Sequence, residues 1–136
     1  MGLVIHGWNL MPSHLHLIVS RKGSISLEEI FRDWKKFTAK KLIQTIKEIN
    51  ESRAEWLLAH FQKAATALKR IDQFKVWQDG NHPVELEGNK MIDERLHYVH
   101  NNPVEAGFVA EPEHWQYSSA GDYAGVKGLI EVDLLE

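Results

Sequence analysis

The chain of 136 residues contains no cysteine. Disulfides, zinc–thiolate sites and thiol nucleophiles are therefore excluded together, and any metal ion must be held by nitrogen and oxygen ligands. The sequence also lacks an apolar run long enough to span a membrane, and its first residues lack a charged segment followed by a long apolar stretch. These absences predict a cytoplasmic protein with no membrane partner.

Acidic residues are scarce in the first part of the chain, and basic residues are scarce in the last part. Between Ser20 and Arg53 there are nine Lys/Arg and five Asp/Glu, a balance of +4. From Pro83 to the end there are three Lys/Arg and eleven Asp/Glu, a balance of −8. The length and the 43% hydrophobic share predict one soluble domain over residues 1–136, with its basic surface in the first half.

Two histidines mark the segment Gly7–Ser20, GWNLMPSHLHLIVS. If this segment is a strand, His14 and His16 project from the same face, because side chains alternate with a period of two. Two neutral imidazoles on one face can hold a divalent metal ion. The alternative is that both are ordinary surface or packed histidines, since His-x-His is a weak motif.

Hydrophobic periodicity and turn residues predict an antiparallel hairpin or a bulged strand, followed by helices. The expected strands cover residues 1–11 and 14–20, with short extended segments at 74–78 and 82–86 and a final strand or ordered tail at 130–134. The expected helices cover 27–50 after an N-cap at Ser26, 55–70 after a cap at Ser52, and a third helix from Asn89 that ends at Pro103. Gly107 suits a helix C-cap, and residues 115–123 are expected to form a loop.

The first of these helices is rich in cations. Beside its apolar stripe, its surface carries Arg32, Lys35, Lys36, Lys40 and Lys47. Such a surface is usually just solvated, but it also suits contact with nucleic-acid phosphates.

The third helix carries Tyr98 and Asn102, which are four residues apart and therefore share one face. A tyrosine is a poor nucleophile at its usual pKa near 10, but a metal ion bound to a phosphodiester polarises the phosphorus and permits attack. Alternatively, Tyr98 is a half-buried packing residue whose hydroxyl finds one partner.

Taken together, these motifs resemble those of the single-tyrosine HUH transposases. The similar segments are MPSHLHLIV, the VWQDGNHP segment at 76–83, LHYVHNNPVEAGFV and HWQYSSAGDY, in the order of the family and over residues 3–123. The branch they resemble is the REP-associated tyrosine transposases, which have an IS200-like transposase domain.

This resemblance implies an α+β fold with a ferredoxin-like antiparallel sheet and helices packed on it. It implies Tyr98 as the nucleophile, and His14, His16 and Asn102 as ligands of Mg²⁺ or Mn²⁺. It also implies contacts with hairpin-forming single-stranded DNA from the residues Arg32, Lys35, Lys36, Lys40, Lys41, Trp77 and Gln78.

The implied activity is that of a transposase that nicks single-stranded DNA through a 5′-phosphotyrosine link and then rejoins the strands. Relative to the family, the chain is expected to lack the first strand and the first helix, and residues 49–74 look like an added helical segment. A homodimer could supply the missing pieces. The alternative function is a catalytically inactive module that binds single-stranded DNA, which is expected if those pieces are needed for chemistry.

Overall fold

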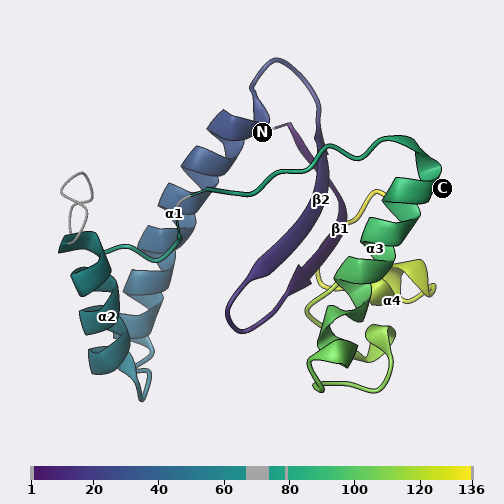
Figure 1. The fold of residues 1–136 in the computed structure, drawn as a ribbon. Helices are drawn as coiled ribbons and strands as arrows, with labels where there is room; N and C mark the ends of the chain where they lie inside the picture. Colours follow the sequence, from purple (N-terminus) through teal and green to yellow (C-terminus); the bar gives the residue numbers. More distant parts are fainter. Residues whose placement is uncertain (1, 67–73, 79, 136) are drawn as a thin grey trace. The chain divides into compact units, whose positions relative to one another are not determined.

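The computed structural model describes residues 2–66, 74–78 and 80–135, and the chain divides into two compact units. The hairpin unit comprises Met1–Leu27 and Val84–Glu136, and the helical unit comprises Glu28–Pro83. The elements are β1 (Leu3–Leu10), β2 (Leu15–Arg21), α1 (Leu27–Glu48), α2 (Ala54–Thr66), α3 (Gly88–Glu105), the 3₁₀ turn η1 (Pro112–His114) and α4 (Ala120–Tyr123) (Figure 1). This composition confirms the predicted α+β class. Within the described residues no helix has the length and apolarity needed to cross a membrane.

The predicted hairpin is confirmed. β1 and β2 pair antiparallel from Leu3↔Arg21 to Leu10↔Leu15, and the turn between them is closed by a bond from the Met11 N–H to the His14 carbonyl (2.8 Å). The register shifts between Ile5 and Gly7, so the ladder also contains a bulge. The interrupting proline lies in the turn, where it costs the ladder no hydrogen bond.

The free edge of β1 is covered by segments from the end of the chain. The N–H of Leu10 donates to the Tyr117 carbonyl, and the N–H of Ser119 donates to the Trp8 carbonyl. Further along, Asp133 donates its N–H to Ile5, so residues 130–134 form an ordered tail rather than a strand. The described residues contain two strands, which confirms the antiparallel sheet, whereas the longer strand order of a ferredoxin-like sheet stays a prediction.

α3 packs on both strands of the hairpin, and Figure 1 shows it beside them. Its close approach depends on Gly7, because a Cβ at this position would lie 2.8 Å from Cδ1 of Leu96. The buried residues of α3 are Val99, His100 and Pro103. This packing fixes where the exposed side chains of α3 lie relative to β2.

Both predicted ends of α3 were wrong in detail. The helix begins at Gly88, after an extended Glu87, rather than being capped by Asn89. It also continues through Pro103 to Glu105, because Pro103 lies in the last turn, where only one helical hydrogen bond is lost, and its ring is fully buried. Gly107 has the expected capping role. With φ at +82°, it ends the helix in a Schellman motif, in which its own N–H bonds Val104 and that of Phe108 bonds Pro103.

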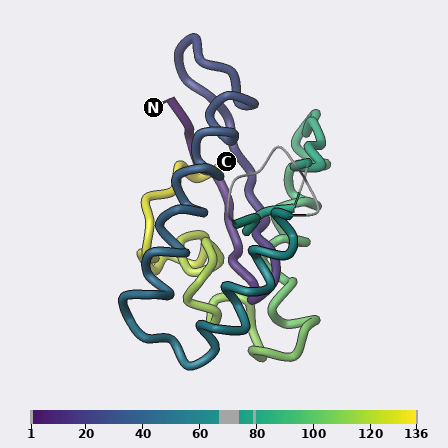
Figure 2. Tube along the Cα trace, turned by 90° about the vertical axis from the view of Figure 1, so that its left-hand side faces the viewer, coloured from purple at the N-terminus to yellow at the C-terminus, as the bar shows by residue number. Residues whose placement is uncertain are grey.

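The helical unit consists of α1, α2 and the segment that follows them. α1 and α2 run in opposite directions and are joined by a short turn (Figure 2). α2 begins at Ala54, and the backbone N–H just before it bonds the Glu51 carboxylate instead of the predicted Ser52 cap. The end of the predicted second helix, 67–70, lies outside the described residues.

The prediction of a strand at Phe74–Gln78 was wrong. These residues have no strand partner in the described part of the chain. They run against the two helices instead: Lys75 donates its backbone N–H to Phe61 of α2, and the Lys47 ammonium lies 5.4 Å from the ring centre of Phe74. Alternating side chains suit a chain that packs on helices as well as one that joins a sheet, and here the helices are the partners.

Residues 115–123, predicted as a loop, contain the short helix α4. Its last residue, Tyr123, donates its hydroxyl to the His6 carbonyl (2.6 Å) and accepts the N–H of Leu135 (3.1 Å). Burial, the largest influence, raises the pKa of Tyr123. This tyrosine therefore ties the bulge of β1 to the ordered tail.

Candidate functional site

The predicted histidine pair lies together at the start of β2. The ring centres of His14 and His16 are 4.9 Å apart, with their planes nearly perpendicular. His14 is exposed at the end of the hairpin turn, and its Nδ1 lies 3.2 Å from the Ser13 hydroxyl. The prediction that both imidazoles occupy one face is therefore confirmed by their contact.

His16 is half-buried, and its ring nitrogens form no hydrogen bond with any described residue. Desolvation, followed by the charge of His14, lowers the pKa of His16 below its ordinary value of 6.5. The imidazole is therefore neutral near neutral pH and keeps a nitrogen lone pair, which is the form that binds metal ions.

Tyr98 lies beside this pair. Its ring centre is 5.7 Å from that of His16, in an edge-to-face arrangement, and its side chain is 47% exposed. The Arg95 guanidinium carbon lies 5.8 Å from the centre of the Tyr98 ring, one turn earlier on α3. The structure thus brings Tyr98 into contact with His16 of the histidine pair, although Tyr98 is distant from the pair in the sequence.

Asn102 follows Tyr98 by one turn of α3 and is half-buried. Its backbone carbonyl accepts the N–H of Ala106. Because Asn102 and Tyr98 are four residues apart on α3, their side chains lie on the same face of the helix. The structure shows no contact between Asn102 and the histidines.

The chemistry of these side chains fits the expected metal ion in part. No group of three or more His, Cys, Asp or Glu side chains that could hold a metal occurs in the described part of the chain. The predicted set offers two imidazoles and one amide oxygen. Imidazole nitrogens suit Mn²⁺ better than Mg²⁺, which prefers an all-oxygen shell. Of the two expected ions, the donor atoms of His14, His16 and Asn102 therefore suit Mn²⁺ better.

Sequence reasoning missed two residues at this centre. Arg95 places a positive charge against the Tyr98 ring, and only its spacing of three residues from Tyr98 could have indicated this. Asn9 is fully buried opposite His16, and neither polar atom of its amide has a hydrogen-bond partner. A polar residue between the apolar residues Trp8 and Leu10 of β1 was the available signal.

A second buried cluster lies where α3 meets the C-terminal segment. His100 is 8% exposed, and its Nε2 lies 2.7 Å from the Ser119 hydroxyl, which also accepts the Trp8 N–H (2.9 Å). Burial first, and then the charge of His97, lower the pKa of His100 to about 4, against a smaller opposing effect of Asp122. Ser119 is completely buried, so this serine–histidine pair cannot reach a substrate and serves as a structural link.

The predicted DNA contacts of the helical unit have different surroundings. Trp77 is half-buried against Trp34, with ring centres 5.1 Å apart, and its indole N–H donates to Thr38 (2.9 Å). Lys35 donates to the backbone carbonyls of Gln78 and Gly80, at 3.3 and 3.4 Å.

The remaining cations of the predicted set are on the surface. Arg32 forms an ion pair with the neighbouring Asp33 (3.2 Å). Three lysines are exposed and form no ion pair with a described residue: Lys36, Lys40 and Lys41.

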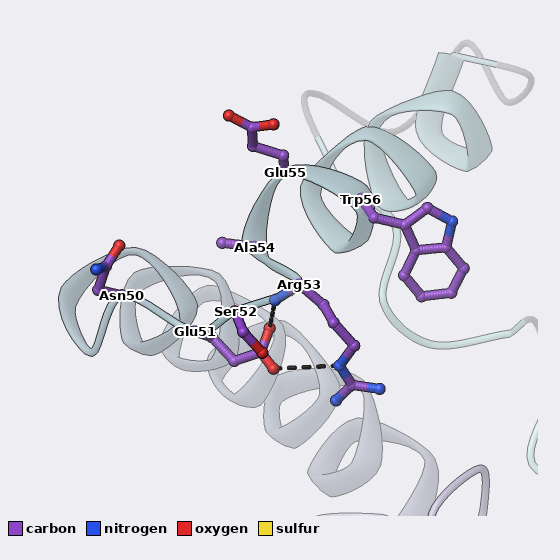
Figure 3. A pocket seen from close by; sticks show the side chains of 7 residues that line it. All are labelled: Asn50, Glu51, Ser52, Arg53, Ala54, Glu55 and Trp56. Atoms are coloured by element: carbon purple, nitrogen blue, oxygen red, sulfur yellow. Dashed lines mark hydrogen bonds and ion pairs between the residues drawn. The ribbon is translucent and has the colours of Figure 1, made fainter.

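A surface hollow lies at the turn between α1 and α2 and is lined by residues 50–56 (Figure 3). Within it, the Glu51 carboxylate binds both the backbone N–H and the Nε of Arg53. Trp56 is 64% exposed and stacks on His60. None of the predicted site residues lines this hollow, so the candidate site remains the cluster around His16.

No protein-family model matches the chain, and searches of curated proteins and of solved structures find no similar protein. The resemblance to tyrosine transposases therefore rests on the sequence motifs, and the cluster stands on its own geometry.

Proposed function

We propose that the protein is a metal-dependent tyrosine transposase that nicks and rejoins hairpin-forming single-stranded DNA. The observation that carries the proposal is the contact between Tyr98 and His16, with ring centres 5.7 Å apart. The nucleophile and the metal ligands come from elements that are far apart in the sequence. The chemistry requires that the nucleophile and the metal ligands lie close together, and the contact of Tyr98 with His16 meets this requirement.

Each side chain of the cluster has a separate role in the proposed reaction. His14, His16 and Asn102 would hold Mn²⁺ or Mg²⁺, and the bound ion would supply Lewis-acid polarisation of the scissile phosphate. Tyr98 presents its hydroxyl to the phosphorus from an exposed position on α3. Arg95 adds a positive charge beside the ring, which would attract the phosphate.

Cleavage then balances in a simple way. The Tyr98 oxygen forms a bond to phosphorus, and the bond from phosphorus to the 3′ oxygen breaks. The phenolic proton passes to solvent, which reaches this half-exposed side chain, and the leaving oxygen takes up a proton to become a 3′-OH. A later attack by a 3′-OH on the 5′-phosphotyrosine reverses these steps and rejoins strands, so no external energy source is needed.

The test is covalent capture of DNA. Protein, Mn²⁺ and a labelled single-stranded hairpin are mixed, and the adduct is resolved under denaturing conditions. We expect an adduct with the unsubstituted protein and none with Tyr98→Phe. The matched control is Tyr117→Phe, which removes another exposed tyrosine hydroxyl of the same unit and should leave the adduct unchanged. An undiminished adduct in Tyr98→Phe refutes the assignment.

A second candidate function is an inactive module that binds single-stranded DNA. The observation that favours it is the surface of α1, where Lys36, Lys40 and Lys41 are exposed without ion pairs to described residues. Phosphate binding by these lysines needs no nucleophile. This candidate predicts DNA binding that weakens as salt is added and no covalent adduct under any metal condition.

A further inference from the structure

Asn9 is an unusual residue for a fully buried position in a strand. Its side chain has no exposed surface, and both its amide oxygen and its amide nitrogen lack a hydrogen-bond partner. Buried polar groups are almost always paired in folded proteins, because an orphan loses its bonds to water without replacement. The neighbouring hydroxyl of Ser118 is already engaged, since it accepts the Ala120 N–H (3.0 Å). An unpaired amide at this position therefore suggests that Asn9 has a role other than folding.

The strand register places Asn9 directly opposite His16. Residues opposite one another in an antiparallel pair project from the same face of the sheet, and their side chains are neighbours. The ring nitrogens of His16 likewise form no hydrogen bond with a described residue. Two cross-strand neighbours on one face therefore have complementary and unused hydrogen-bonding groups.

The residues around His16 differ in their burial. His14 is exposed, His16 is half-buried and Asn9 is fully buried. A metal ion or a DNA strand would reach the two imidazoles from the exposed side, on which His14 lies. Asn9 is the buried neighbour of His16 across the ladder, and its amide is free to bond a ring nitrogen that is not used for a metal ion.

We propose that Asn9 is a positioning residue for His16. The bond is not formed in the structure, but when His16 binds a metal ion through one ring nitrogen, the Asn9 amide oxygen would accept the N–H of the other ring nitrogen and hold the imidazole in its metal-binding orientation. This role rests on the proposed function, because it assumes that His16 is a metal ligand. Histidine ligands commonly donate their second ring N–H in this way, and loss of the acceptor lowers metal affinity by about tenfold to a hundredfold.

Because the Asn9 amide has no hydrogen-bond partner, the substitution Asn9→Leu can separate a role in metal binding from a role in folding. Leucine has the same branching as asparagine but no polar atom. In the metal-free protein, Asn9→Leu removes two unpaired buried groups, so its melting temperature should equal or exceed that of the unsubstituted protein. Its affinity for Mn²⁺ should nevertheless fall about tenfold or more. A residue that only supported the fold would lose stability and affinity together.

The experiment uses the full chain. Mn²⁺ binding is measured by titration from the electron paramagnetic resonance signal of free Mn²⁺, and the melting temperature is measured with and without Mn²⁺. His14→Ala defines the affinity lost when a ligand is removed. Asn9→Asp, which keeps the shape and an acceptor oxygen, should restore most of the Mn²⁺ affinity even though a buried carboxyl lowers the metal-free melting temperature. Ser119→Ala removes another buried polar group and should lower the melting temperature without changing the affinity.

The outcomes separate this role from the proposed function. If Asn9→Leu binds Mn²⁺ within twofold of the unsubstituted protein, while His14→Ala does not bind, the positioning role is wrong and the metal site stands. If the unsubstituted protein shows no Mn²⁺ binding and no thermal shift, the metal site and the positioning role are both wrong. If Asn9 behaves as expected but no Tyr98 adduct forms, Asn9 positions His16 in a metal site that does not cleave DNA.

Discussion

Acidification should destabilise the hairpin unit through His100. This side chain is 8% exposed and is linked by the Ser119 hydroxyl to the backbone of β1. Burial and the charge of His97 lower its pKa from 6.5 to about 4, although Asp122 acts in the opposite direction. The ring of Tyr123 also lies against it, 5.3 Å away between centres. The folded state therefore holds this histidine in its neutral form.

The sign and size of the effect follow from this difference in pKa. Between about pH 6.5 and pH 4, the unfolded chain binds a proton that the folded chain does not. Stability is therefore full above pH 6.5 and falls as the pH drops towards 4. Lowering the pH from about 7 to about 4 should reduce the free energy of unfolding by about 3 kcal/mol through His100 alone, and by about 1.4 kcal/mol near pH 5.5.

Urea unfolding at several pH values measures this loss. His100→Gln should lower stability at neutral pH, because the link to Ser119 is weakened, but should remove about 3 kcal/mol of the acid-dependent loss. His97→Gln, on the same helix and exposed, is the matched control and should keep most of the loss. If the unsubstituted protein and His100→Gln lose the same free energy between pH 7 and pH 4, the buried neutral histidine is not the cause and the reasoning fails.

Three further changes test the packing and the basic surface. Gly7→Ala should lower the free energy of unfolding by about 1–2 kcal/mol, because the new Cβ meets Leu96. Most of this loss should vanish in a Leu96→Ala background, which is measured by urea unfolding of the unsubstituted protein, the two single variants and the double variant. Gly107→Ala should lower stability by about 1 kcal/mol, since the residue has φ at +82°; an unchanged unfolding midpoint would exclude a left-handed cap. Neutralising three exposed lysines to glutamine should weaken binding of single-stranded DNA and make its logarithmic salt dependence less steep, as measured by fluorescence anisotropy, whereas an unchanged slope would exclude the surface formed by Lys36, Lys40 and Lys41.

Local signals predicted the hairpin and the cores of the helices. Alternation on either side of Pro12 gave both strands, because a hairpin is determined by neighbouring residues and a turn. The errors were at helix ends and in the segment at 74–78, where partners distant in sequence decide the outcome. Pro103 illustrates this, since the burial of its ring outweighs the usual tendency of a proline to end a helix.

For the candidate site, His14, His16 and Tyr98 were predictable because their spacing and motifs are local, and their proximity in space then followed only from the structure. Asn9 and Arg95 were not predictable in the same way. The importance of Asn9 depends on the register of β1 against β2 and on its complete burial. The neighbouring residues in the sequence predict neither of these. The packing of Trp77 against Trp34 was not predictable either, because the two residues are distant in the sequence and meet only in the folded chain.

The pairing of β1 has a consequence for synthesis of the chain. Its free edge is completed by Ser119, which follows its partner Trp8 by 111 residues, and by Asp133, whose partner is Ile5. At about 5–20 residues per second, a ribosome needs roughly 5–20 s to supply the first of them. During that time β1 has unpaired N–H and C=O groups on one edge, which can pair with another chain. We therefore expect the nascent chain to depend on chaperones, or on slow elongation at low temperature, until Ser119 has left the ribosome.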